Sequence, residues 1–206
     1  MVTVHYFYDP MCGWCYGATP LLETIADNNK FKLILHPGGM LPEKAIEPSF
    51  RQHILDSDRR ISQLTGAQFG QSYVERVTGN DDLILDSYLP TRAILVGESL
   101  GLEPFIMLKA IQKAHYIDGK PVNEQSTLEE LAVHSGLDKM LWREKMQTEE
   151  NPEDAVINHS HQLMMQLQVQ GYPTLFLEDK GQLIRLPHTE YYGRGEQWQT
   201  FLESLI

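Results

Sequence analysis

VTVHYFYDPMCGWC, residues 2–15, carries the clearest structural and chemical signals in this sequence. The run from Val2 to Tyr8 is β-branched or aromatic at every position but one, and Asp9-Pro10 ends it, which is typical of a buried strand followed by a turn. From about residue 12 to residue 28, apolar residues recur at helical spacing, as in Leu21, Leu22 and Ile25. We therefore expect a strand that leads into a helix, with a Cys-x-x-Cys pair where that helix begins.

The segments on either side of the middle of the chain predict one mixed sheet. Phe31 to His36 has the pattern of a second strand, so residues 1–40 form a βαβ unit with parallel strands. Asn151-Pro152 is a typical helix start, and that helix is expected to run to about Gln168. Two further strands, 174–178 and 182–187, and a closing helix, 196–205, follow it. The order is βαβ, then αββα.

Between these two parts, residues 41–150 read as a helical insertion. Apolar periodicity and glycine stops predict helices over 49–65, 88–100, 104–115, 127–135 and 139–147. Ser126 and Glu129 have the spacing of a capping box for the fourth of these. We accordingly expect a discontinuous domain, 1–40 with 151–206, and an inserted helical domain, 41–150.

Composition excludes several classes of partner. The 206 residues are 42% hydrophobic and 22% charged, with a formal net charge of -11, which is an ordinary globular composition that repels nucleic acid and anionic membranes. No stretch approaches the roughly 18–20 apolar residues of a membrane span. The N-terminus has neither the basic nor the long apolar region of a signal peptide, so we expect a cytoplasmic protein that binds neither nucleic acid nor membrane.

The two cysteines, Cys12 and Cys15, point to redox chemistry. Two cysteines cannot build a disulfide framework, and a zinc site would need a second pair, so we expect no metal. At a helix start, free backbone N–H groups and the positive end of the helix dipole favour the Cys12 thiolate, and Cys15 lies one turn away. The alternative is a pair of packed core cysteines, but the strand–helix context favours the redox interpretation.

A second motif, Gly171-Tyr172-Pro173-Thr174, precedes the third strand and by itself indicates only a turn. Together with Phe7 to Gly17, however, it resembles the active-site segment and cis-proline loop of the DsbA-family thioredoxin-like oxidoreductases. The similarity is greatest to their cytoplasmic FrnE-like and protein-disulfide-isomerase branch. Residues 114–120 and 128–132 resemble that family's helical insertion, so the resemblance spans essentially the whole chain.

The resemblance implies an α/β, thioredoxin-like fold and a thiol–disulfide oxidoreductase or disulfide isomerase. Cys12 and Cys15 would be catalytic, and Gly13, Trp14, Tyr172 and Pro173 would bind substrate. A cis Pro173 would place the Tyr172 backbone against the Cys12 sulfur, where it could pair with an extended peptide. The expected partners are protein or peptide thiols and disulfides, with glutathione as a candidate co-substrate and no bound cofactor.

Two other functions stay open. The superfamily also contains glutathione-dependent kappa-class transferases and 2-hydroxychromene-2-carboxylate isomerases, which act on small molecules. These typically have Ser near the first Cys position and lack the second Cys, so both cysteines here favour redox chemistry. The third reading is a non-catalytic binding module that uses the helical insertion. His115, at a predicted helix end, could orient a substrate, although a solvated or capping histidine is the more common case.

Overall fold

A mixed β-sheet forms the centre of the molecule in the computed structural model, which describes residues 2–148 and 150–206. The strand order is β2-β1-β5-β6, with β1 and β2 parallel, β5 antiparallel to β1, and β6 antiparallel to β5. The four predicted strands are confirmed, with bounds Val2–Tyr8 (β1), Phe31–Pro37 (β2), Thr174–Asp179 (β5) and Gln182–Arg185 (β6).

Side-chain alternation along β1 divides the core into two layers. Val4, Tyr6 and Tyr8 point to one face, where they join the large cluster that contains both cysteines. Phe7 points to the other face and packs with Phe176 and neighbouring apolar residues. Because both faces are covered, this central strand is apolar almost throughout, as a strand in the middle of a packed sheet must be.

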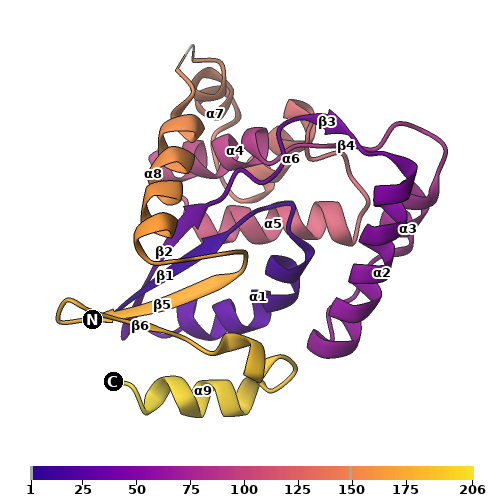
Figure 1. Cartoon of the computed structure of the whole chain (residues 1–206). Coiled ribbons are helices and arrows are strands. Elements are labelled where there is room, and N and C mark those ends of the chain that lie inside the picture. Colours follow the sequence, from indigo (N-terminus) through magenta and orange to yellow (C-terminus); the bar gives the residue numbers. More distant parts are fainter. Residues whose placement is uncertain (1, 149) are drawn as a thin grey trace.

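Helices cover both faces of the sheet (Figure 1). On the Tyr6 side lie α1 (Gly13–Ala26) and α9 (Gly195–Glu203), joined by the Trp198 indole N–H, which donates to the Leu21 carbonyl at 2.9 Å. On the Phe7 side lies α8 (Pro152–Gln166), which contributes Leu163 and Met164 to the smaller cluster. A short 3-10 helix, η1 (His188–Tyr191), connects β6 to α9.

The middle of the chain is largely helical, as predicted, and packs beside the sheet (Figure 1). Its helices are α2 (Pro48–Thr65), α3 (Gln71–Thr78), α4 (Tyr88–Ser99), α5 (Pro104–Tyr116), α6 (Gln125–His134) and α7 (Lys139–Met146). Two features are not predicted by the sequence analysis: helix α3, and the antiparallel pairing of β3 (Lys44–Ala45) with β4 (Ile84–Leu85). The domain boundaries at 40 and 150 stay a prediction.

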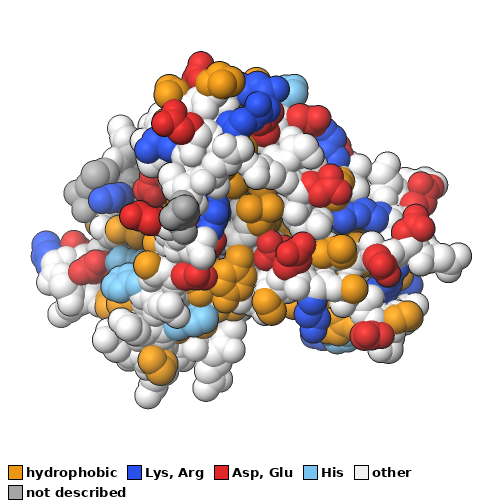
Figure 2. All heavy atoms as spheres, turned by 90° about the horizontal axis from the view of Figure 1, so that it is seen from above, with side chains coloured by type: hydrophobic (Ala, Val, Ile, Leu, Met, Phe, Trp, Pro, Cys, Tyr) orange, Lys and Arg blue, Asp and Glu red, His pale blue; other side chains and the backbone are white. Residues whose placement is uncertain are grey.

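The surface mixes charges of both signs. On the face shown in Figure 2, Lys and Arg side chains lie among Asp and Glu, with apolar patches between them. Within the described part of the chain, no helix has both the length and the apolar character needed to span a bilayer.

Candidate active site

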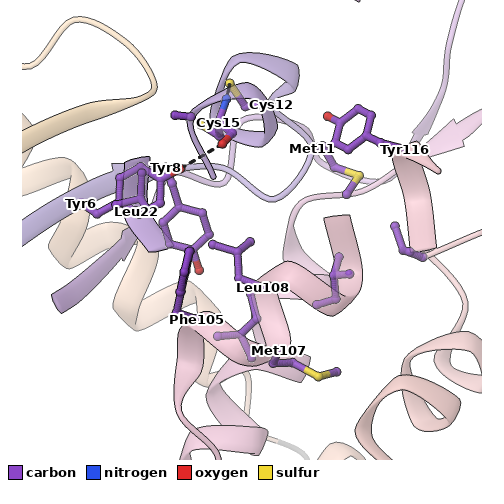
Figure 3. Close-up of a cluster of buried hydrophobic side chains, with 14 of the residues drawn as sticks. Tyr6, Tyr8, Met11, Cys12, Cys15, Leu22, Phe105, Met107, Leu108 and Tyr116 are labelled. Atoms are coloured by element: carbon purple, nitrogen blue, oxygen red, sulfur yellow. Dashed lines mark hydrogen bonds between the residues drawn. The ribbon is translucent and has the colours of Figure 1, made fainter. Parts of the chain in front are cut away.

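The cysteine pair lies at the first turn of α1. Cys12 is the N-cap residue, with extended backbone angles, and its Sγ accepts a hydrogen bond from the Cys15 N–H at 3.4 Å. Figure 3 shows the two cysteines next to each other at this turn, with the Tyr6 hydroxyl directed at the Cys15 carbonyl, 3.4 Å away. Cys12 Sγ therefore lies against a backbone N–H at the start of α1, where the positive end of the helix dipole is located.

The two sulfurs differ in exposure. Cys15 is fully buried, whereas Cys12 is 7% exposed and lines a cavity. Burial raises the pKa of the Cys15 thiol well above its ordinary value, and hydrogen bonding and charge interaction with Cys12 act in the same direction. Of the two sulfurs, that of Cys12 thus lies at the cavity, whereas Cys15 is enclosed and its raised pKa favours the thiol form.

Asp9 fixes the turn between β1 and α1. Its buried carboxylate accepts from the Met11 N–H at 2.9 Å, the Ser87 hydroxyl at 2.7 Å and the Met40 N–H at 2.6 Å. Burial raises the pKa of this carboxyl to about 6, although the three hydrogen bonds favour the charged form. Asp9 therefore joins the active-site turn to the loop after β2 and to the start of α4.

A cis proline faces the cysteines from the other end of the sequence. The Tyr172–Pro173 peptide bond is cis, and the Cys12 thiol lies 3.7 Å from the Tyr172 carbonyl oxygen, to which it donates. The Tyr172 ring fits against Gly38, where a Cβ atom would come within 2.2 Å of the ring. Only glycine at position 38 leaves room for this placement of Tyr172.

Trp14 stands between two cavities. We call the first the insertion pocket: a cavity of about 210 Å³ between the α1 start, α2, α3 and the end of α5, with Cys12 and Trp14 in its wall. The second, the proline pocket, of about 330 Å³, is lined by Trp14, Leu64, Tyr172, Pro173, His188, Thr189 and Tyr192. The Trp14 ring stacks on that of Tyr192, with centroids 6.1 Å apart. Trp14 therefore lines both cavities, whereas Cys12 lines only the first.

Buried polar side chains lie in the wall of the insertion pocket. The Tyr73 hydroxyl donates to Asp58 Oδ2 at 2.8 Å, and the His115 ring packs edge-on against Tyr73. Burial raises the pKa of Asp58 to about 6 and lowers that of His115 to about 3, so the imidazole is neutral at physiological pH. The expectation of a solvated or capping His115 is wrong, because Tyr73 and Tyr116 enclose its ring and leave it 2% exposed.

The sequence of the chain matches the model of a known protein family. Residues 3–193 match the DSBA-like thioredoxin domain. The chain belongs to the DsbA-like thioredoxin family. That assignment agrees with the resemblance read from residues 7–17 and 171–174, and with a mixed sheet accompanied by many helices.

Solved structures of DsbA-like proteins cover nearly the whole chain. The cytosolic disulfide reductase DsbM from Pseudomonas aeruginosa is 36% identical, with 98% of each chain covered and a TM-score of 0.89, and a structure of it with GSH is 34% identical. A candidate protein disulfide isomerase from Nitrosomonas europaea is 22% identical over 98% of each chain, with a TM-score of 0.79. A 2-hydroxychromene-2-carboxylate isomerase shares the fold at 12% identity and a TM-score of 0.60. The search of the curated proteins finds no match.

The six predicted site residues of this DsbA-like protein lie around one point. Cys12, Cys15, Gly13 and Trp14 form the first turn of α1, and Tyr172 and Pro173 face Cys12. The sequence did not indicate that Asp58 and His188 line the pockets. It marked His115 as a candidate but did not predict that its ring is buried in the pocket wall. No local signal marks these three, because they approach the site only through packing of helices and loops distant in the sequence. In residues 2–148 and 150–206, no three His, Cys, Asp or Glu side chains gather as metal ligands would.

Proposed function

We propose that this DsbA-like protein is a cytoplasmic dithiol–disulfide oxidoreductase that works as a disulfide reductase, with Cys12 as nucleophile and Cys15 as resolving thiol. The observation that carries the proposal is the position of Cys12 Sγ: it caps α1, faces the Tyr172 carbonyl and lies in the wall of an open pocket. The similarity to a cytosolic disulfide reductase supports both the direction and the compartment.

The reaction has two exchange steps. The Cys12 thiolate attacks one sulfur of the substrate disulfide, a Cys12–substrate disulfide forms, and the other substrate sulfur leaves as a thiolate. Cys15 Sγ then attacks Cys12 Sγ, the Cys12–substrate bond breaks, and the proton of Cys15 passes to the departing substrate sulfur, which leaves as a thiol, so that a Cys12–Cys15 disulfide remains. Two molecules of a small thiol, of which glutathione is the proposed one, reduce this disulfide and depart as the thiol's own disulfide. The DsbM structure with GSH supports that choice.

The same first step serves substrates of different size. Beside Cys12, the Tyr172 backbone offers a place for an extended peptide, which would bind as an added strand. Disulfide isomerisation would need only the first step and its reversal, so it stays a secondary proposal. The isomerase type that acts on hydroxychromenes has only the fold in common with this chain, and the second cysteine has no use in that chemistry.

Reduction of insulin and of bis(2-hydroxyethyl) disulfide, with glutathione as the reductant, tests the proposal. We expect Cys12→Ser to lower turnover of both substrates at least about 100-fold, because the thiolate is the nucleophile. Cys15→Ser, incubated with disulfide in the absence of glutathione, should accumulate a Cys12 mixed disulfide that intact-mass measurement detects. Turnover by Cys12→Ser at the rate of the unaltered protein would refute the assignment of Cys12.

A further inference from the structure

The insertion pocket has an apolar wall that the exchange steps do not use. Ile54, Ile61, Val77, Leu83 and Leu85 line it, and all but Ile54 are almost completely buried. At its edge, two large apolar side chains remain in contact with water: Met40, 43% exposed, and Phe50, 45% exposed. Apolar side chains left exposed beside a reactive cysteine would lose that contact with water when a ligand fills the pocket.

Charge limits what the pocket can hold. Among the described residues that line it, none is Lys or Arg, and the only carboxyl group is that of Asp58. The exposed imidazole of His53 is the one lining group, among the described residues, that could carry positive charge, so the carboxylates of glutathione would find no cation deeper in the pocket, where burial of an unpaired charge is costly. The pocket therefore suits the uncharged part of a substrate, while any charged part stays outside.

A buried histidine in the pocket wall has a ring nitrogen without a partner. His115 lines the cavity and is 2% exposed, and its Nδ1 forms no hydrogen bond. Because that nitrogen has no exposed surface, a ligand in the cavity does not reach it, and the neutral ring of His115 acts as part of the mostly apolar wall.

We propose that the insertion pocket is a subsite for an uncharged, ring-sized apolar group carried on the sulfur that Cys12 attacks, so that the preferred substrates are mixed disulfides with one aromatic side. The inference rests on the proposed function. Size supports it, since cavities of about 150 Å³ hold benzene and this one measures about 210 Å³. For a benzyl–glutathione disulfide, the bond from Cys12 Sγ to the benzyl-bearing sulfur forms, the original S–S bond breaks, and the electron pair leaves on the glutathione thiolate.

The test compares two mixed disulfides of glutathione, one with benzyl mercaptan and one with 2-mercaptoethanol. We expect kcat/KM to be about tenfold higher for the benzyl compound, which corresponds to about 1.4 kcal/mol. Ile54→Trp, which fills the pocket from α2, should bring the ratio of the two kcat/KM values close to one. Gln63→Trp, at an exposed position on the same helix, is the matched control and should keep the ratio. Thermal unfolding of both variants establishes that they are folded.

Equal kcat/KM values for the benzyl and hydroxyethyl compounds in the unaltered protein, or equal ratios in Ile54→Trp and Gln63→Trp, would overturn the subsite. Failure to reduce either compound would instead overturn the proposed function itself.

Discussion

Two buried aspartates lie close to the cysteine pair, and their hydrogen bonds give them different roles. Asp9 accepts from two backbone N–H groups and one hydroxyl, so its carboxylate holds the active-site turn in place. Asp58 accepts one hydrogen bond, from Tyr73, and lines the insertion pocket. Asp58 has fewer donors to stabilise its charge and does not hold the turn between β1 and α1. It can therefore be replaced by a neutral residue without loss of that turn.

Asp58→Asn should flatten the pH dependence of stability between pH 4 and pH 7. Burial raises the pKa of Asp58 from 3.8 to about 6, so in this window the unfolded chain releases a proton that the folded chain retains. Stability contributed by this group is complete below about pH 4 and is lost as pH rises through 6, by about 2–3 kcal/mol in total. Urea denaturation at pH 4, 5, 6 and 7 measures the difference between the unaltered protein and the variant.

The exposed Asp56, on the same helix, supplies the control. Its side chain is 57% exposed and pairs with Arg59, so Asp56→Asn should shift stability by less than about 1 kcal/mol across the same pH range. If Asp58→Asn and the unaltered protein gave parallel curves of unfolding free energy against pH, the folded protein would not hold the Asp58 proton more tightly than the unfolded chain.

How well the site could be predicted depends on how local its signals are. Cys12 and Cys15 are three residues apart on one helix turn, so spacing alone brings their sulfurs together. Pro173 was placed only through resemblance to a family, because 160 residues separate Tyr172 from Cys12. The positions of Asp58 and His115 could not be predicted from the sequence, because only the packing of α2 and α5 around the pocket brings them to the same cavity as Cys12.

At the scale of elements, glycines allow α1 and α2 to approach closely. Gly13 and Gly17 lie one turn apart on α1, and Ile61 of α2 packs against both. A Cβ atom at Gly17 would lie 2.7 Å from Ile61 Cγ2 and 3.0 Å from Thr65 Cγ2. Since α2 also forms a wall of the insertion pocket, this contact sets the position of that wall relative to the cysteines.

Gly17→Ala should lower the free energy of unfolding by up to about 2 kcal/mol. Alanine favours a helix over glycine by about 1 kcal/mol, but the added methyl overpacks the contact with Ile61, which typically costs about 1–3 kcal/mol. Gly97→Ala, in α4, is the matched control: the nearest atom to its new Cβ is 3.5 Å away, so the same change should raise stability by up to about 1 kcal/mol. Chemical denaturation of both variants measures the two effects, and a stabilised Gly17→Ala would show that the helices move apart at no cost.

The helices that sequence predicts best are those with strong start and stop residues. Pro152 occupies the first turn of α8 as expected, and the predicted 104–115 helix is confirmed to within one residue. The predicted capping box of Ser126 and Glu129 is wrong. Helix α6 begins at Gln125, its N-cap residue is Glu124, and no side chain forms a capping hydrogen bond there. Helix α3 was missed because it has eight residues, of which Tyr73 and Val77 alone are buried, so its apolar periodicity is too short to detect.

At the scale of the whole molecule, a buried ion pair joins the helical insertion to the returning chain. Arg92 of α4 donates from Nε and Nη2 to the Glu153 carboxylate of α8, at 2.7–3.0 Å. Their side chains are 15% and 7% exposed. Arg92 also donates to the Asn151 side chain, so Asn151 does not cap α8 as its N-cap position predicts. The first helical turn of α8 is thus fastened to α4, whose own start is held by Asp9 through Ser87.

Breaking this pair from either side should be far more harmful than replacing it whole. Arg92→Met leaves the Glu153 carboxylate buried without a cation, and Glu153→Leu leaves the guanidinium likewise, so each should cost about 3–5 kcal/mol. The double variant buries two apolar side chains in the same space and should recover most of that loss. Urea denaturation of the four proteins at pH 7 gives the coupling free energy directly. Costs that simply add in the double variant would mean that α4 and α8 are held by their apolar contacts, and that this ion pair contributes no coupling between the two helices.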